Sequence, residues 1–552
     1  MVIKAGGIVK NKFDKYTKNP RKVNEEILLK IINLNVSTEI GKKYNFKNIK
    51  SIEDFKKNFP LTDYSFYEDY IKRMGEGEKN ILISKNIKYF GHTSGTTGKQ
   101  KLIPVTKESR KIASKYMAFY SNRVCYESFK ENWTYGRGVL ISDIVNTNYT
   151  KSGIPICSAT SGGMNGIKYI IPFLFTSPLE VMKITDKEAA LYLHLLFALE
   201  ESSLMYISGV FISNILDFFR VLEEKYQLLV RDIRKGRVNN KINIDEKTRT
   251  ALNKLLSPNV SRAEKLEEEF NKGFKGIAKR IWPRLLYIET VTGANFSIYD
   301  DKVNYYTASL PIYSPSYAST EAMIGINPYI NKIRYVIIPD TAFYEFIPIE
   351  KGEVNANKTL NIDELEIGKK YEIVITNNAG LYRYRIGDVI KVVGYYNNCP
   401  EVEFMYRKNQ VLNMVSEKTN EEHLTDAIRG TMKKLNINLI DYTTEPDNSI
   451  TPGRYIFYFE FKDKISKNQI KLIEKTLDNE LRKANLAYDR ARNNKKLDKV
   501  KVVMLLPNTF NLIKESLLKK GISKNQIKVP RVIINNKNIR KVITSNCQNN
   551  DM

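Results

Sequence analysis

The sequence is poor in the residues that bind metals and form disulfide bonds. It has four cysteines and three histidines among 552 residues, and no two cysteines form a CxxC pair. A structural zinc site and a disulfide framework are therefore not expected, and a reducing, cytoplasmic location is the default. Zinc hydrolases and Ser-His-Asp enzymes would have to use His92, His194 or His423, which disfavours both classes.

Long hydrophobic runs are also missing. The longest uncharged apolar segments, 189–199 and 202–216, are shorter than the roughly 20 residues of a membrane span, so we expect buried helices there. Lys4 and Lys10 interrupt the first residues before a signal-peptide core can form. Proline and glycine total 18 and 28 residues, too few for a fibrous chain.

Positive charge is the main compositional excess. The 88 Lys and Arg against 61 Asp and Glu give a net charge of +27, which raises the possibility of nucleic-acid binding. The lysines are spread along the whole chain and form no single stripe, which favours a solvated basic surface. Hydrophobic residues make up 42% and aromatic residues 11%, which excludes wholesale disorder.

The patterning predicts an α/β protein. The first 80 residues are mostly helical, and an amphipathic helix with Thr106 as N-cap follows a loop near residue 95. Residues 185–235 form a helical block, and strands alternate with turns over 285–395, including 303–318. After about Arg407 the pattern is that of a separate small α+β domain.

The strongest chemical signal is a loop between two strand-like runs, made of Thr93, Ser94, Gly95, Thr96, Thr97, Gly98 and Lys99. Glycines let the backbone approach a polyphosphate, and amide and hydroxyl groups donate hydrogen bonds to its oxygens. The loop is not a Walker A motif, because Thr93 replaces the first glycine and Gln100 follows the lysine. An ordinary Gly/Ser/Thr turn is the alternative.

Two further clusters support nucleotide binding. Residues 316–321 end in Glu321, and a carboxylate beside ATP phosphates is a usual Mg²⁺ ligand. Alternatively, Ser319 or Thr320 caps a helix that starts there. Residues 382–388 end in Asp388, which can accept hydrogen bonds from two ribose hydroxyls, although a surface Arg–Asp turn is the simpler interpretation.

With TSGTTGK, YASTE and YRYRIGD in this order, the sequence resembles the adenylate-forming superfamily of acyl-CoA synthetases and luciferases. Within it, the chain is most similar to the auxin-responsive Gretchen Hagen family of acyl-acid amido synthetases. The segments GLYRYRIGDVIKVVGYYNNCPEVEF and NQIKVPR are the most specific, SEKTNEEHL also matches in order, and the similarity covers almost the whole chain.

The resemblance implies an adenylate-forming fold with two domains. Residues 1–406 would bind ATP and an acyl acid, and residues 407–552 would rotate between two half-reactions. The acid would be adenylated with release of pyrophosphate, and an amino-acid amine would then displace AMP.

By the same resemblance, Glu321 would bind Mg²⁺ and Lys418 would reach the α-phosphate, and we take both as the catalytic residues. Lys528 is a weaker second phosphate contact, with a plain surface lysine as the alternative. The remaining nucleotide-binding residues would be Thr93, Ser94, Gly95, Thr96, Thr97, Gly98, Tyr317, Ala318, Ser319, Thr320, Asp388 and Arg407.

The acyl pocket is less well defined. Val291, Met323 and Phe343 are candidate apolar lining residues, each with core packing as the alternative. We expect a monomer or weak oligomer that acts on a small carboxylic acid and an amino acid, without a nucleic-acid or membrane partner. The competing hypotheses are a thioester-forming acyl-CoA synthetase and a non-catalytic basic binding protein.

Overall fold

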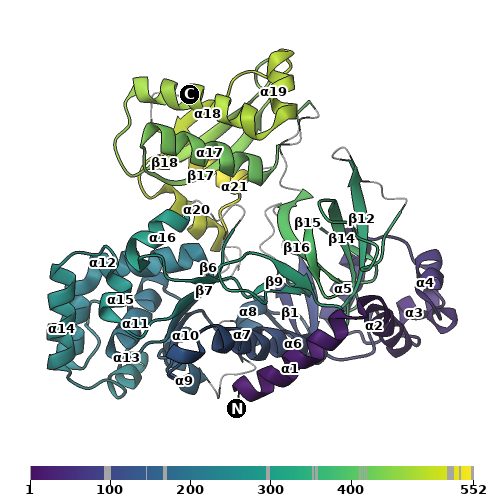
Figure 1. Cartoon of the computed structure of the whole chain (residues 1–552), viewed down its shortest axis with the longest axis horizontal. Helices are drawn as coiled ribbons and strands as arrows, with labels where there is room; N and C mark the ends of the chain where they lie inside the picture. The colour runs from purple at the N-terminus through teal and green to yellow at the C-terminus, as the bar shows by residue number, and fades with distance from the viewer. Residues whose placement is uncertain are drawn as a thin grey trace.

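The computed structural model describes residues 2–92, 101–144, 146–165, 169, 171–293, 299–350, 353–354, 358–408, 412, 414–415, 417, 419–518, 528–533 and 536–548. We call 2–408 the N-terminal body and 419–548 the C-terminal body. Figure 1 shows the C-terminal body above the N-terminal body, with α20 (Thr509–Leu518) close to α16 (Asp300–Thr307). No described helix combines the length and the apolar composition that a bilayer crossing requires.

A helical region begins the N-terminal body. It contains α1 (Val2–Thr17), α2 (Pro20–Leu34), α3 (Glu39–Lys43), η1 (Phe46–Asn48), α4 (Ile52–Asn58) and α5 (Tyr64–Glu76). Local chemistry sets the ends of α5: the Asp63 side chain accepts the Ser65 N–H at its start, and Gly77 ends it with φ of 106°. The predicted mostly helical start of the chain is confirmed.

The next part of the chain forms a four-stranded sheet in the order β2-β1-β5-β4. Its strands are β1 (Ile87–His92), β2 (Leu102–Thr106), β4 (Asn146–Tyr149) and β5 (Pro155–Cys157). The helical segment after β2 consists of α6 (Lys107–Ser114), η2 (Lys115–Tyr120) and α7 (Ser121–Ser128), followed by η3 (Lys130–Asn132). Thr106 caps it as predicted, because its hydroxyl accepts the Ser109 N–H at 3.2 Å.

The centre of the N-terminal body is a parallel sheet in the order β3-β6-β7-β8. Its strands are β3 (Gly138–Ile141), β6 (Tyr206–Phe211), β7 (Tyr287–Val291) and β8 (Ile312–Tyr313). The helices between them are α8 (Ala159–Asn165), α9 (Ile171–Leu174), α10 (Leu179–Met182), α11 (Lys187–Glu200), α12 (Ile212–Lys235), α13 (Glu246–Asn253), α14 (Val260–Asn271), α15 (Ile277–Ile281) and α16.

Two sequence-based expectations are wrong in this region. Residues 206–211 form the strand β6, where we expected a buried helix over 202–216. A parallel strand covered on both faces is continuously apolar, so its pattern matches that of a buried helix. Residues 303–307 belong to the helix α16, where we expected a strand; Val303 and Tyr306 are buried on it, at the helical spacing of three.

An eight-stranded sheet completes the N-terminal body in the order β13-β12-β14-β15-β16-β11-β10-β9. Its strands are β9 (Ser316–Ala318), β10 (Met323–Ile326), β11 (Tyr335–Ile337), β12 (Phe343–Glu350), β13 (Glu353–Val354), β14 (Lys370–Thr376), β15 (Tyr384–Tyr396) and β16 (Cys399–Arg407). The apolar run after Glu321 is thus the strand β10 and not a helix, because all four of its residues are buried.

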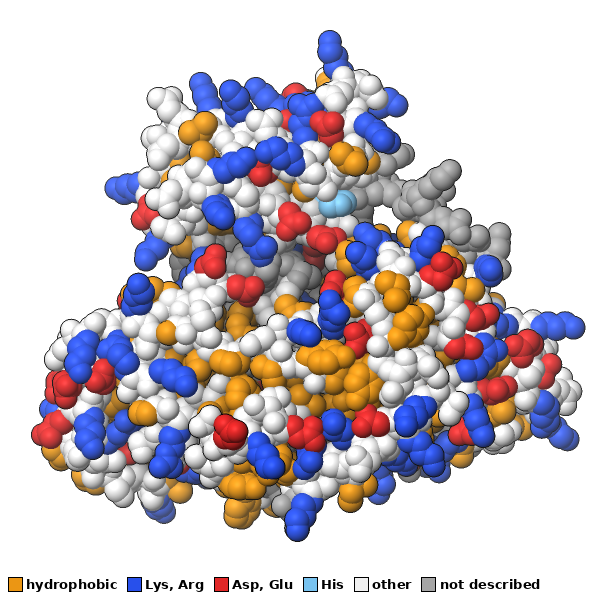
Figure 2. All heavy atoms as spheres, in the orientation of Figure 1, with side chains coloured by type: hydrophobic (Ala, Val, Ile, Leu, Met, Phe, Trp, Pro, Cys, Tyr) orange, Lys and Arg blue, Asp and Glu red, His pale blue; other side chains and the backbone are white. Residues whose placement is uncertain are grey.

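The C-terminal body has its own three-stranded sheet and core. The strands β17 (Leu439–Asp447), β18 (Arg454–Phe461) and β19 (Lys501–Met504) pack with α17 (Glu421–Leu435), α18 (Lys467–Ala484), α19 (Leu486–Asn493), α20 and α21 (Lys537–Ser545). Figure 2 shows Lys and Arg side chains dispersed over both bodies on this face. The predicted small α+β pattern is confirmed, and the exact domain boundary stays a prediction.

Candidate active site

Two side chains from separate strands donate hydrogen bonds to one buried carboxylate, Asp388, which lies on a third strand. The Tyr317 hydroxyl donates to Asp388 Oδ2 at 2.8 Å, and Arg407 Nε donates to Asp388 Oδ1 at 2.6 Å. Asp388 and Arg407 are direct partners in the β15–β16 register, while Tyr317 comes from β9 at the far edge of the sheet. The Asp388 carboxylate raises the pKa of Arg407, and burial together with Asp388 raises that of Tyr317.

A tight turn presents Glu321 to the same region. The Ser319 hydroxyl accepts the backbone N–H groups of Glu321 and Ala322, each at 3.2 Å, and Asn377 Nδ2 donates to the Glu321 carbonyl at 2.7 Å. The charge of Glu321 adds to the raised pKa of Arg407. Glu321 and Asp388, predicted separately from the sequence, therefore act on one arginine.

The predicted phosphate loop lies outside the described residues, which exclude Thr93, Ser94, Gly95, Thr96, Thr97, Gly98 and Lys99. The strands on either side of it, β1 and β2, are described. A Cβ added to Gly91 would approach Thr320 Cγ2 to 2.6 Å, and the Leu102 N–H donates to the Tyr64 hydroxyl at 2.9 Å. The field of Glu321 raises the pKa of Tyr64 in addition to burial. The end of β1 thus lies beside the turn that carries Glu321, and the tyrosine that contacts the start of β2 lies in the field of the Glu321 carboxylate.

The C-terminal body contributes Lys528 to this cleft. Its Nζ lies 4.5 Å from the centre of the Phe211 ring. Lys528 is exposed, yet desolvation by the neighbouring protein lowers the pKa of its ammonium group to about 8. Arg407 lowers that pKa further, whereas Glu421 and Asp388 oppose the change. Lys528 is therefore electrostatically coupled to the Asp388–Arg407 pair. Lys418 lies outside the described residues.

The candidate acyl-pocket residues are less tightly grouped. Val291 is half-buried at the carboxyl end of β7, beside Phe211 in the strand register. Met323 is buried and pairs with Ala318, next to the Glu321 turn. Phe343 is only 1% exposed and packs edge-on against Phe55 of α4. The structure places Phe343 in the hydrophobic core, which matches its packing alternative.

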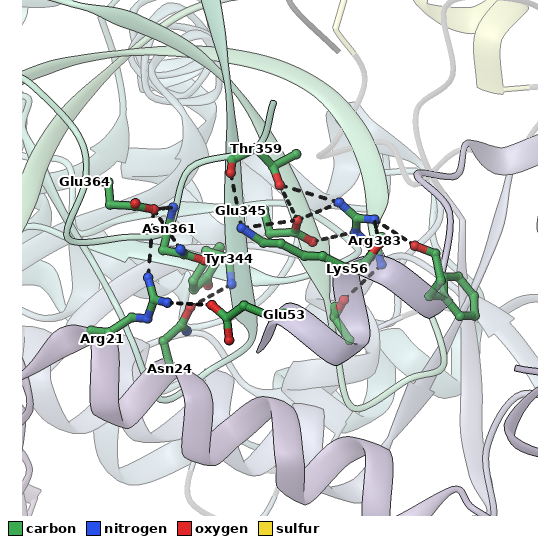
Figure 3. A network of polar contacts seen from close by, with 12 residues as sticks. Arg21, Asn24, Glu53, Lys56, Tyr344, Glu345, Thr359, Asn361, Glu364 and Arg383 are labelled. Atoms are coloured by element: carbon green, nitrogen blue, oxygen red, sulfur yellow. Dashed lines mark hydrogen bonds and ion pairs between the residues drawn. The ribbon is translucent and has the colours of Figure 1, made fainter. Parts of the chain in front are cut away.

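The sequence did not predict the contacts of Arg383, which hold the start of the strand that carries Asp388. Arg383 has a left-handed φ of 44° and is buried against Glu345, with Nη2 to Oε1 at 2.8 Å. Its Nη1 donates to the carbonyls of Lys56 and Phe59, so α4 is tied to the start of β15 (Figure 3). The only sequence signal was an arginine between two tyrosines, which has no specific meaning without the fold.

The site fits a nucleotide with a bound Mg²⁺. Magnesium at ATP usually takes one or two protein carboxylates and fills its remaining positions with phosphate oxygens and water. Glu321 supplies one carboxylate, and the described residues contain no cluster of three acidic, His or Cys side chains that would form a separate metal cage. The residues present therefore suit a metal carried with the substrate phosphates.

Comparisons with known proteins identify the family of this chain. Three family models match in order: the GH3 family N-terminal domain over residues 9–312, the central domain over 335–407 and the C-terminal domain over 422–537. Indole-3-acetic acid-amido synthetase GH3.17 from Arabidopsis thaliana is 29% identical, covering 94% of this chain and 92% of the relative. A probable indole-3-acetic acid-amido synthetase from Oryza sativa subsp. japonica is 31% identical, covering 94% and 92%.

Solved structures show the same fold. The GH3.15 acyl acid amido synthetase superposes with a TM-score of 0.87 at 26% identity, over 98% of this chain and 96% of that one. A 2-hydroxyisobutyryl-CoA ligase in the postadenylation state has a TM-score of 0.55 at 11% identity, over 95% and 91%, which shows the adenylate-forming fold alone. Family models that together match most of the residues establish that the chain belongs to the GH3 family.

Proposed function

We propose that the chain is an ATP-dependent acyl-acid amido synthetase. It adenylates a small carboxylic acid and transfers the acyl group to the amine of an amino acid. The observation that carries this proposal is the cluster of Tyr317, Asp388 and Arg407, with Glu321 and Lys528 coupled to the same arginine. Family membership supports it, because the relatives named above are amido synthetases.

Asp388 is the residue that binds the ribose. A carboxylate has about four acceptor positions, and Tyr317 and Arg407 occupy two of them. The remaining two can accept the 2′- and 3′-hydroxyls, while the two donors hold the carboxylate in place. This preorganised acceptor fixes the α-phosphate relative to the acid, so that less entropy is lost in reaching the transition state.

In the first half-reaction, a carboxylate oxygen of the acid attacks the α-phosphorus and pyrophosphate leaves. Negative charge accumulates on the phosphoryl oxygens, so nearby positive charge and hydrogen-bond donors lower the barrier. Mg²⁺, held by Glu321 and the phosphates, supplies part of that charge when bound. Lys528 contributes from the C-terminal body, and Lys418 is proposed for the same role from the sequence.

In the second half-reaction, the amine nitrogen attacks the acyl carbonyl carbon, the nitrogen loses a proton and AMP leaves with the electron pair of the broken C–O bond. Adenylation makes this possible because it turns a poor leaving oxygen into AMP. We further propose rotation of the C-terminal body, with a boundary near Arg407, between the two half-reactions. Cytoplasmic location stays a prediction from the small number of cysteines in the sequence.

The decisive experiment measures pyrophosphate release with ATP, Mg²⁺ and a pool of carboxylic acids. Positive acids are then incubated with single amino acids, and acyl-amino-acid products are identified by mass spectrometry. We expect pyrophosphate release with at least one acid and an amide product with at least one amino acid. Product formation with coenzyme A alone would replace the amide assignment by a thioester-forming one.

A further inference from the structure

Glu289 is a carboxylate inside the N-terminal body that has no role in the mechanism above. It is on β7, with Ser208 of β6 and Tyr313 of β8 as its strand partners. Strand alternation places Glu289 on the same face as Tyr287, whereas Ile288 points into the opposite core. Figure 1 shows β6 and β7 between the helices α11–α15 and the eight-stranded sheet.

The surroundings of Glu289 are aromatic and apolar. Burial raises the pKa values of Cys125, Tyr206, Tyr287 and Tyr313, and the negative charge of Glu289 raises them further. The Tyr287 ring stacks between Phe129 and Tyr206, with centroids 5.3 and 5.4 Å apart. The hydroxyls of Tyr206 and Tyr313 donate to the backbone carbonyls of Leu174 and Asn327, so these two groups do not serve Glu289.

Among the residues the structure describes, no cation compensates Glu289. Burial alone raises its pKa to about 7, and no basic side chain opposes that rise. The residue nevertheless remains partly accessible to solvent. A group that is strongly desolvated and still accessible lies in a recess, and a carboxylate in an apolar recess is costly unless a partner arrives.

Glu289 lies near the carboxyl end of β7. β7 continues from Glu289 to Val291, whose strand partner Phe211 lies under the Lys528 ammonium. Two residues of a strand span roughly 7 Å, so Glu289 lies about that distance from Val291, toward the start of β7. Ligands in open α/β sheets bind beyond the carboxyl ends of parallel strands. Glu289 is therefore placed for the far end of a substrate whose carboxyl group lies near Lys528.

We propose that Glu289 is a specificity-determining residue that accepts a hydrogen bond from a donor group, an amine or a hydroxyl, at the far end of the carboxylic acid substrate. The inference rests on the proposed function, because it names the class of acid that would be adenylated. A site built around a buried acceptor rejects an analogue that lacks the donor, since the acceptor then loses its partner.

The test uses matched acids that differ only in the far group. For 3-phenylpropanoate, the para-hydroxy acid is compared with para-methyl, and para-aminomethyl with para-ethyl. For linear acids, 6-aminohexanoate is compared with heptanoate. Pyrophosphate release by the wild type should favour the donor in at least one pair by on the order of 100-fold in kcat/KM. The pair that responds distinguishes a neutral donor from a cationic one.

Two substitutions assign the preference to this residue. Glu289→Leu should abolish or invert this preference. The isosteric Glu289→Gln should still prefer acids with a hydroxyl donor but should lose the preference for acids with a cationic group. Glu268→Leu, which removes an exposed carboxylate on α14, is the matched control and should leave the ratios unchanged. Wild-type ratios within about threefold in every pair, or ratios unchanged in Glu289→Leu, overturn the inference.

Calorimetric binding of the same acids separates this inference from the proposed function. If no acid releases pyrophosphate, the proposed function fails. In that case a donor preference in binding that Glu289→Leu removes supports the recess assignment on its own. Binding without such a preference overturns the assignment as well.

Discussion

At the scale of single residues, the Asp388 carboxylate is the group on which the hydrogen bonds of the candidate site converge. It is only 2% exposed, and its two oxygens accept from a tyrosine hydroxyl and an arginine. An acceptor held by two donors keeps one orientation, which suits the ribose-binding role proposed for it. Its charge also holds Arg407, so a neutral replacement changes two groups at once.

Asp388→Asn should therefore damage ATP use more than stability. The amide keeps the shape but offers one acceptor oxygen and no charge, so Arg407 loses its counterion. We expect kcat/KM for ATP in pyrophosphate release to fall by roughly 10²–10³, the scale of losing a preorganised group. Asp363→Asn, at an exposed carboxylate paired with Arg21, is the control. Equal kinetics in the two variants would exclude ribose binding by Asp388.

Glu289 should make stability depend on pH. Its pKa is raised to about 7 in the folded protein, above the ordinary value of 4.5, so the folded state holds an extra proton between these values. Stability is then lost as pH rises from 4.5 to 7, by at most about 3 kcal/mol, and stays lower above pH 7. The facing groups Cys125, Tyr206, Tyr287 and Tyr313 remain neutral over this range because their pKa values are raised.

Thermal unfolding of wild type and Glu289→Gln at pH 5 and pH 8 checks this. The variant should gain stability relative to the wild type at pH 8, because the amide carries no charge at either pH. A stability difference that is the same at both pH values would show that the carboxylate is well solvated.

At the scale of elements, the contact between β1 and the Glu321 turn sets the position of the end of β1 relative to the carboxylate that we propose binds Mg²⁺. Gly91→Ala should place a Cβ 2.6 Å from Thr320 Cγ2 and push the strand and the turn apart. Overpacking of this kind costs typically 1–3 kcal/mol, and we expect slower pyrophosphate release as well. Differential scanning calorimetry and the pyrophosphate assay measure the two effects.

Thr320→Ser provides the test of that mechanism. It removes the methyl group that the new Cβ would meet and keeps the hydroxyl. The double variant should recover most of the stability and activity lost in Gly91→Ala. Additive losses in the double variant would locate the damage elsewhere in β1.

The sequence predicted elements correctly where neighbouring residues determine the local structure. It predicted them poorly where burial in the folded protein determines it. Thr106 was correctly predicted as a cap because capping depends on neighbouring residues. β6 and the run after Glu321 were misassigned because burial on both faces removes the periodicity that separates strand from helix. Tyr317 and Asp388 could be predicted as site residues from motif order, but their direct hydrogen bond requires the sheet.

At the scale of the whole molecule, a buried polar network joins the two bodies. Tyr299 donates to Asp441 Oδ2 at 3.0 Å and accepts from Arg531 Nη2 at 3.0 Å. Lys302 of α16 donates to the carbonyls of Leu439 and Ile440. Because the Asp441–Arg531 ion pair belongs to the C-terminal body, α16 can separate from that body without breaking the pair.

Tyr299→Phe combined with Lys302→Met should loosen this orientation while each body stays folded. The double variant removes hydrogen bonds that contribute about 1 kcal/mol each, and both replacements keep the apolar part of the side chain. Small-angle X-ray scattering should show a larger radius of gyration and a broader distance distribution than in the wild type. Lys434→Ala, which removes an exposed ion pair with Glu480 inside the C-terminal body, should leave the scattering unchanged. If the double variant also scatters like the wild type, packing and not this network holds the bodies together, and rotation would have to break apolar contacts instead.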